Sequence, residues 1–277
     1  MNRLVKSDFK RFFKDKLFLV VIILAFVFAV ITPLLYVAVF GAMGEIDPMT
    51  EEMLSGYVNA KGQFFGAFSF GNNLGLIAPL LIGIILFKDF SFGTIRNKII
   101  SGHSRTSIFF SIFTVCTVML FGIVLAHALL TLAVSLPFFD YQSTPFVLSD
   151  FWYLLQSLLF EFFVYLFAAA FMSWLCVTQK NVGMVIVMYI AVVFGATMIA
   201  GILQMVLIVI RENPKMENVV SVLDFVQRIN VFNSSASIGL GTSYKAEDFV
   251  YFVFVPLVFT SGLTAHGIWK FSRKDLK

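Results

Sequence analysis

Long apolar stretches are the feature that most constrains this chain. Six of them recur along its 277 residues. A helix of about 20 apolar residues crosses the ~30 Å hydrocarbon core of a bilayer. Hydrophobic residues make up 59% of the chain and charged residues only 13%, against about 25% charged residues in an ordinary soluble domain. The sequence predicts one all-α polytopic membrane domain over residues 1–277.

The apolar stretches place the predicted transmembrane helices. They cover residues 17–40, 73–87, 108–136, 151–177, 182–210 and 249–269. The second is short for a bilayer, so part of the aromatic stretch 64–70 is expected to enter the membrane too. The first follows a basic segment, as in a signal peptide, but it is too long and lacks a small-residue cleavage site. We interpret it as a retained helix.

Charges divide unevenly between the two sets of predicted loops. The set that includes both termini holds 15 basic residues and four acids, whereas the other set holds five basic residues and 11 acids. Lys and Arg accumulate in the cytoplasmic loops of membrane proteins. We therefore expect both termini in the cytoplasm and the acid-rich loops on the outer side.

Two further segments are expected to lie at a membrane surface. In residues 1–16, aromatic residues recur at three- and four-residue intervals among basic ones, which predicts an amphipathic helix on the inner membrane surface. The alternative is a basic tail that only sets the topology. Residues 219–226 and 229–240 are too apolar for a solvated loop and too short to span, so they are predicted to be re-entrant or interfacial pieces before the last helix.

Residues 88–107 form the most motif-like charged segment. Its basic residues are Lys88, Arg96, Lys98 and Arg105. Asp89 is its single acid, so the segment is predicted to be cytoplasmic. Ile95, Ile99 and Ile100 share one helix face, and the polar residues between them lie largely elsewhere. The pattern predicts a short amphipathic helix on which another protein could push; the alternative is that the basic residues only determine the topology.

Glu161 is the one charged residue predicted deep inside a membrane helix. It lies about ten residues, or roughly 15 Å, from the outer end, and an intramembrane carboxylate needs a partner. His127 falls at a matching depth of the preceding helix. One hypothesis is that the two pair and line a polar translocation path or bind substrate. The other is that Glu161 is protonated and bonded to Ser157 or Tyr165, one helical turn away, and His127 is simply packed.

Motifs of catalysis are missing from the sequence. No P-loop, no His-Glu-x-x-His and no Gly-x-Ser-x-Gly occurs. Cys116 and Cys176 lie inside predicted membrane helices, and the three histidines are scattered. We expect no catalytic residue, no metal site, no cofactor bound by this chain and no nucleic-acid partner.

The order of these features resembles the permease subunits of type-two ABC exporters, in particular small bacterial ones linked to bacteriocin or lantibiotic immunity and peptide-antibiotic export. Such permeases have a cytoplasmic amphipathic N-terminal helix, six membrane helices, a coupling helix between the second and third, and a partly re-entrant outer segment before the sixth. The most specific match is Asp89, followed by Gly93-Thr94-Ile95-Arg96-Asn97-Lys98 and then Ser104-Arg105. It is similar to the family's acid, Gly-Thr, basic stretch and Ser-Arg.

The resemblance implies a non-enzymatic membrane subunit in the bacterial cell membrane. Two copies of a separate P-loop ATPase, which binds ATP and Mg, would dock on the coupling loop 88–107. The implied ATPase-coupling residues are Asp89, Phe90, Gly93, Thr94, Arg96, Asn97, Lys98 and Arg105. A second permease, identical or different, would complete the complex. An amphiphilic cargo, such as an antimicrobial peptide, a drug or a lipid-like molecule, would leave through or along the interface of the permeases.

Two other classes of function compete with this interpretation. An ion-coupled secondary transporter would use Glu161 as its coupling site, although paired inverted repeats and matching interrupted helices are not evident. A non-transporting immunity or sensor protein would bind a toxin without moving it.

Overall fold

The computed structural model describes residues 2–43, 59–71, 73–138, 147–211, 213–238 and 243–274. Within these ranges the chain is helical and has no strand. Six of the described helices are long and apolar enough to cross a membrane, which confirms the predicted all-α polytopic membrane fold. The first five are α2 (Lys16–Met43), α5 (Asn73–Ser91), α7 (Arg105–Ser135), α8 (Leu148–Thr178) and α9 (Val182–Ile210). The sixth is continuous through α12 (Ala246–Phe249), a π-helical turn (Val250–Phe254) and α13 (Val255–Arg273).

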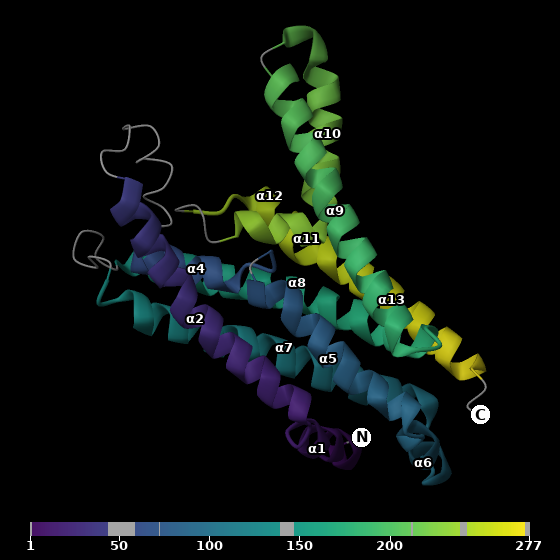
Figure 1. Ribbon diagram of the computed structural model, residues 1–277. Helices are drawn as coiled ribbons and strands as arrows, with labels where there is room; N and C mark the ends of the chain where they lie inside the picture. The colour runs from purple at the N-terminus through teal and green to yellow at the C-terminus, as the bar shows by residue number, and fades with distance from the viewer. Residues whose placement is uncertain are drawn as a thin grey trace.

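The long helices run up and down, so the bundle has two ends (Figure 1). The α6 end carries α1 (Asn2–Phe12), α6 (Thr94–Ile100) and both ends of the described chain. The α4 end carries α4 (Ala60–Phe68) and α12. Elements that are far apart in the sequence therefore meet at each end of the bundle.

Helix α5 is longer than the predicted helix 73–87, because it continues to Ser91. Lys88 and Asp89 therefore belong to a membrane-spanning helix rather than to the loop. Both charges are accommodated there by partners: Lys88 Nζ lies 2.7 Å from Asp15 Oδ2, and Asp89 Oδ2 lies 3.2 Å from Lys98 Nζ. The other five predicted helices differ from the observed ones only near their ends.

The aromatic stretch before α5 forms the short helix α4, which packs against α7 and α8. Asn59 caps its first turn, because the side-chain oxygen accepts a hydrogen bond of 2.6 Å from the backbone N–H of Gly62. Phe64, Phe65 and Phe68 are buried. This helix is part of the packed bundle and not a surface loop.

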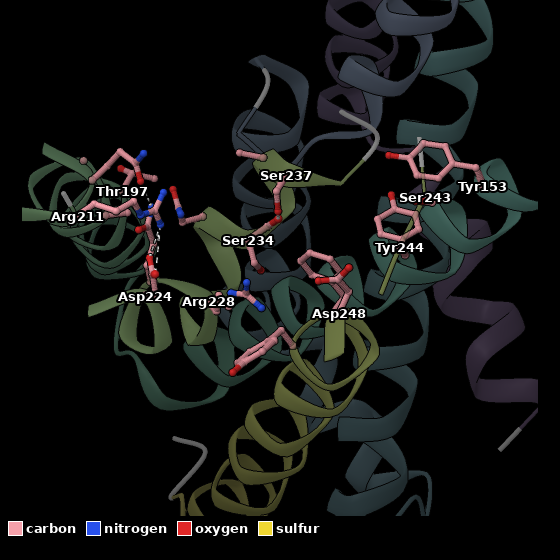
Figure 2. A pocket seen from close by; sticks show the side chains of 18 residues that line it. Tyr153, Thr197, Arg211, Asp224, Arg228, Ser234, Ser237, Ser243, Tyr244 and Asp248 are labelled. Atoms are coloured by element: carbon pink, nitrogen blue, oxygen red, sulfur yellow. Dashed lines mark hydrogen bonds and ion pairs between the residues drawn. The ribbon is translucent and has the colours of Figure 1, made fainter. Parts of the chain in front are cut away.

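The described residues between α9 and α12 fold back along α9, and their predicted re-entrant or interfacial position in a membrane stays a prediction. Helix α10 (Glu217–Ile229) runs beside α9 and buries none of its residues (Figure 1). Helix α11 (Val231–Ser234) and the 3-10 turn Ser235–Ser237 are inserted against the bundle. With α8, α9 and the start of the sixth long helix, they surround a cavity of about 720 Å³ (Figure 2).

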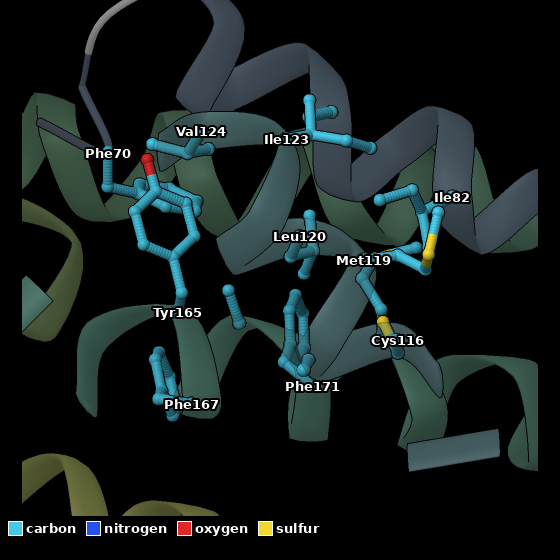
Figure 3. Close-up of a cluster of buried hydrophobic side chains, with 14 of the residues drawn as sticks. Phe70, Ile82, Cys116, Met119, Leu120, Ile123, Val124, Tyr165, Phe167 and Phe171 are labelled. Atoms are coloured by element: carbon cyan, nitrogen blue, oxygen red, sulfur yellow. The ribbon is translucent and has the colours of Figure 1, made fainter. Parts of the chain in front are cut away.

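The core lies between α4, α5, α7 and α8. Leu120 and Val124 of α7 face Tyr165 and other large side chains of α8 (Figure 3). Helix α5 approaches α8 closely at Gly83, where a Cβ would lie 1.8 Å from the Met172 Cε. Only glycine fits there unless Met172 moves, which is how small residues bring membrane helices together.

Helices α8 and α9 differ in how much of their surface is covered. In the most apolar stretch of each, 67% of the residues of α8 are buried but only 22% of those of α9. The exposed residues of α9 are large and apolar, such as Met198, Ile202 and Val209. An apolar surface of this kind contacts membrane lipid or another protein.

Candidate functional site

Two glycines separate helix α6 from its neighbours. Gly93 has φ 69° and Gly102 has φ 87°, a region of backbone conformation that residues with a Cβ rarely adopt. The chain turns sharply at both, and Ser104 then caps α7 by accepting a hydrogen bond from the backbone N–H of Ser107. The short helix predicted between the second and third membrane helices is α6.

Four charged side chains, of which Asp8, Asp89 and Lys98 are buried and Arg11 is 40% exposed, form a cluster that joins α6 to α1 and α5. Lys98 Nζ lies 2.7 Å from Asp8 Oδ1 and 3.2 Å from Asp89 Oδ2. Arg11 contacts Asp89 closely, and its Nη2 is 3.7 Å from Asp8 Oδ1. Ser111 of α7 donates a hydrogen bond of 2.6 Å to Asp8 Oδ2. Elements from four parts of the sequence therefore share one network.

The charges of this cluster balance. Asp8 and Asp89 are 5% and 3% exposed, and they face the cations of Lys98 and Arg11. A buried ion costs several kcal/mol of desolvation unless a partner of opposite charge and further hydrogen bonds are in place. Both carboxylates have cationic partners, and Asp8 also accepts the hydrogen bond from Ser111, so the network fixes the position of α6 relative to α1 and α5.

Arg105 and Lys274 hold the ends of other helices at the same end of the bundle. Arg105 Nη1 donates to three carbonyl oxygens at the C-terminal end of α13, 2.6–3.2 Å away. Lys274 Nζ donates to the carbonyl of Val177 in the last turn of α8 and to that of Gln179 just after it, at 2.8 and 3.0 Å. Burial lowers the pKa of Lys274 below its usual value. Both side chains satisfy carbonyls that a helix end leaves without partners.

One face of α6 and of the turn before it stays exposed. Its residues are Phe92, Arg96, Asn97 and Ile100. Phe92 is 77% exposed and Ile100 is 73% exposed, although both are large and apolar. Apolar side chains around a basic and an amide group are the composition of a contact surface for another protein.

The predicted burial pattern of α6 is partly wrong. Ile95 is buried and Ile99 packs against the core, as their shared face requires. Ile100 was predicted to share that face, but it is exposed, whereas Lys98 is buried. Lys98 turns inward because Asp8 and Asp89 supply its ammonium group with two carboxylates.

The remaining predicted coupling residues shape or fill the turn. Phe90 packs between Phe87 and Phe271, with ring centroids 5.9 Å from each. Gly93 makes the turn itself. Thr94 lines a cavity of about 110 Å³ beside the ion cluster. Of the eight predicted residues, Arg96 and Asn97 alone are classed as exposed, and they belong to the exposed face.

Two residues of the ion cluster, Asp8 and Arg11, are not among the residues that the sequence analysis selects. A pattern in the sequence does point to Asp8. Leu4, Asp8 and Phe12 recur every four residues and share one helix face, and they are 4%, 5% and 2% exposed. An acid on the apolar face of an otherwise basic helix needs a cation inside the fold.

Glu161 and His127 do not pair, so the hypothesis of a joint site is wrong. Glu161 Oε1 accepts a hydrogen bond of 2.8 Å from Ser235 Oγ, which itself accepts one of 2.7 Å from the backbone N–H of Phe70. His127 Nδ1 lies 2.9 Å from the carbonyl oxygen of Ala25 in α2. Residues 231–238, which return to the bundle, supply the partner of Glu161 that depth within a predicted helix alone does not reveal.

The alternative partners of Glu161 are wrong as well. Ser157 donates to the carbonyl of Tyr153, and Tyr165 donates to the carbonyl of Phe68. Glu161 Oε2 has no hydrogen-bond partner among the described residues. Two hydrogen bonds, from Phe70 to Ser235 and from Ser235 to Glu161, thus anchor the turn Ser235–Ser237 to α8.

No protein-family model, curated protein or solved structure matches this chain. Among the described residues, no group of three or more His, Cys, Asp or Glu side chains is placed to hold a metal ion. The functional argument therefore rests on the geometry of the α6 end and on the pattern of the sequence.

Proposed function

We propose that this chain is the membrane-spanning permease subunit of an ATP-driven exporter of the ABC type in the bacterial cell membrane. Both termini and the α6 end face the cytoplasm in this proposal, because the basic residues of the sequence gather there. The observation that carries it is the exposed face of α6, on a helix whose opposite side is joined to α1 and α5 by buried ion pairs.

This arrangement can transmit a displacement of α6 to the long helices. Phe92 and Ile100 offer apolar surface to a partner, and Arg96 offers a positive charge. Lys98 lies on the same short helix and binds Asp8 and Asp89, so α6 moves only together with α1 and α5. A contact made on α6 is then passed to the long helices as a rigid-body shift.

The partner that would push is a P-loop ATPase. This chain has no P-loop of its own, so two copies of a separate ATPase would bind ATP and Mg. A second permease subunit, identical or different, would cover part of the exposed apolar surface of α9. The cargo would be an amphiphilic molecule that leaves through or along the interface between the two permeases.

Co-purification tests the proposal. The tagged chain is produced in its own host and solubilised in a mild detergent, and the eluate is assayed for a bound P-loop ATPase and ATP hydrolysis. Arg96→Glu is expected to remove most of the bound ATPase, because it reverses the charge of the exposed face. Lys180→Glu is the matched control, since Lys180 is an exposed basic residue in the turn between α8 and α9.

Failure of the wild-type chain to retain any ATPase would contradict the exporter proposal. Equal retention by both variants would contradict docking on α6. Proton-dependent flux without an ATPase would support a secondary transporter, but neither the 720 Å³ nor the 110 Å³ cavity is lined by Glu161 or His127. Toxin binding without flux would support an immunity or sensor protein.

A further inference from the structure

The proposed function does not use the 720 Å³ cavity at the α4 end. Its walls come from α8, α9, α10, α11 and the start of the sixth long helix (Figure 2). Its volume falls in the range of about 300–1,000 Å³ that is typical of small-molecule sites. Several hydroxyl and amide side chains line it, including Thr197, Gln204, Gln227, Asn233, Ser234 and Ser237.

Charged side chains of both signs also line the cavity. Arg211 Nη2 lies 3.0 and 3.2 Å from the two carboxylate oxygens of Asp224. Arg228 Nη1 lies 3.3 Å from Glu247 Oε1, and its guanidinium stands 5.3 Å from the ring centroid of Tyr251. The two arginine side chains are 62% and 45% exposed. Ion pairs this exposed contribute little to stability, so a ligand can exchange with them at small cost.

The charge balance selects the class of ligand. Arg211 and Arg228 line the cavity together with Asp224 and Asp248. A purely anionic ligand would meet two carboxylates, and a purely cationic one would meet two guanidinium groups. A zwitterion can satisfy both signs at once, with its anionic group on an arginine and its cationic group on Asp224, which Arg211 then releases, or on Asp248.

The surroundings of the cavity are apolar. Met205 of α9 is 72% exposed, Phe225 of α10 is 53% exposed and Phe254 of the sixth long helix is 64% exposed. The ring centroid of Phe225 lies 6.4 Å from that of Tyr251, which lines the cavity. A ligand whose head group enters the cavity can therefore lay an apolar tail on neighbouring surface.

We propose that the cavity binds the phosphate–ammonium head group of a zwitterionic amphiphile. The phosphate contacts Arg228 and Arg211, and the ammonium group contacts Asp248 and Asp224. This site lies at the opposite end of the bundle from α6. It requires neither an ATPase nor transport, so it goes beyond the proposed function and can be tested separately.

Titration of the purified full chain in detergent micelles tests the site. The probe is dihexanoyl phosphatidylethanolamine below its micellar concentration, and the comparison is dihexanoyl phosphatidylglycerol, which has the same tails and a net negative charge. Saturable binding of the first, at least roughly tenfold tighter than that of the second, is expected. Equal binding of the two would overturn the proposal. Glycerophosphoethanolamine, which has no tails, reports whether the source of the head group is a lipid or a soluble zwitterion, because it competes effectively in the second case alone.

A charge-neutral double variant places the site. Asp224→Asn with Arg228→Gln removes one charge of each sign from α10 and is expected to weaken binding of the zwitterionic probe about tenfold. Lys215→Gln with Glu217→Gln is the matched control, because both exposed residues belong to the same outer segment but do not line the cavity. Wild-type affinity of the first double variant would overturn the proposal. If that variant unfolds, Arg211→Gln tests the same prediction from α9.

Discussion

At the α6 end, the side chains of Asp8, Asp89 and Lys98 are 4–10% exposed and that of Arg11 is 40% exposed, whereas at the α4 end those of Arg211 and Arg228 are 62% and 45% exposed. Charges are paired at both ends, but the pairs at the α6 end are largely shielded from water and those beside the cavity are exposed to it. Attraction between charges is far stronger where water is excluded, and so is the cost of leaving one unpaired. The first end is therefore locked by its ions, and the second keeps its ions available.

One ion pair at the α4 end is shielded from water like those at the α6 end. Lys61 of α4 lies 2.5 Å from Asp150 of α8, and their side chains are 27% and 15% exposed. This pair at the α4 end joins two packed helices, as the ion cluster does at the other end. The exposed pairs join elements that surround the cavity. Ion pairs that join packed helices are more buried, and ion pairs beside the cavity are more exposed.

The largest effect is expected from Lys98→Met. The variant leaves Asp8 and Asp89 buried with Arg11 as their remaining cation. Removing one partner of a buried ion pair costs about 3–5 kcal/mol of unfolding free energy. Thermal unfolding in detergent should show a fall in Tm of roughly 10 °C, whereas Arg96→Met on the exposed face should change it by less than about 2 °C.

A second substitution sharpens this test. Asp89→Leu together with Lys98→Met removes one charge of each sign, so Asp8 and Arg11 remain as a balanced pair. The double variant should recover much of the stability that Lys98→Met loses, because an apolar pair can replace a buried ion pair at little cost. Equal losses in the single and double variants would show that packing, and not charge, holds α6.

A smaller loss is expected from Ser235→Ala. Ser235 accepts from the backbone N–H of Phe70 and donates to Glu161, so its removal leaves two buried polar groups without partners. The expected cost is about 1–3 kcal/mol. Hydrogen exchange should rise in residues 231–238 and in the backbone around Phe70. Ser237→Ala, which removes only a local hydrogen bond of 2.7 Å from an exposed residue to the carbonyl of Ser234, should change both much less.

Arg105→Gln should cost about 1–2 kcal/mol, because three carbonyl oxygens at the end of α13 lose their donor but stay within reach of water. The expected readout is faster hydrogen exchange in residues 270–274, without a change in α6. Arg273→Gln is the control, since Arg273 is exposed at the same helix end and stacks on Trp269 instead. The same increase in both variants would mean that this end of α13 frays whatever side chain caps it.

The membrane helices could be predicted because each is long and apolar along its whole length. The predicted helix 182–210 coincides with α9, whose ends are set by local signals such as the cap at Asn181. Helix α5 was predicted too short, because its last turn contains Lys88 and Asp89. Their partners come from other parts of the chain, and a local pattern does not show that a charge inside a membrane helix is paired.

The candidate sites could be predicted only in part, for a related reason. Depth placed Glu161 and His127 at one level, but the rotation of each helix directs them to Ser235 and to the Ala25 carbonyl. The walls of the 720 Å³ cavity come from residues between Tyr153 and Phe252 that follow no motif. These lining residues come together only because the described chain between α9 and α12 returns to the bundle.

The smallest effect is expected from Arg211→Gln. Its pair with Asp224 is exposed, and such pairs are worth about 0–1 kcal/mol, so unfolding in detergent should stay within about 2 °C of the wild type at any salt concentration. Affinity for the zwitterionic probe should fall in the same variant. A loss of stability as large as that of Lys98→Met would show that the charges around the cavity are structural. The charged residues would then have the same structural role at both ends of the bundle, which would contradict the proposal that the cavity binds a ligand.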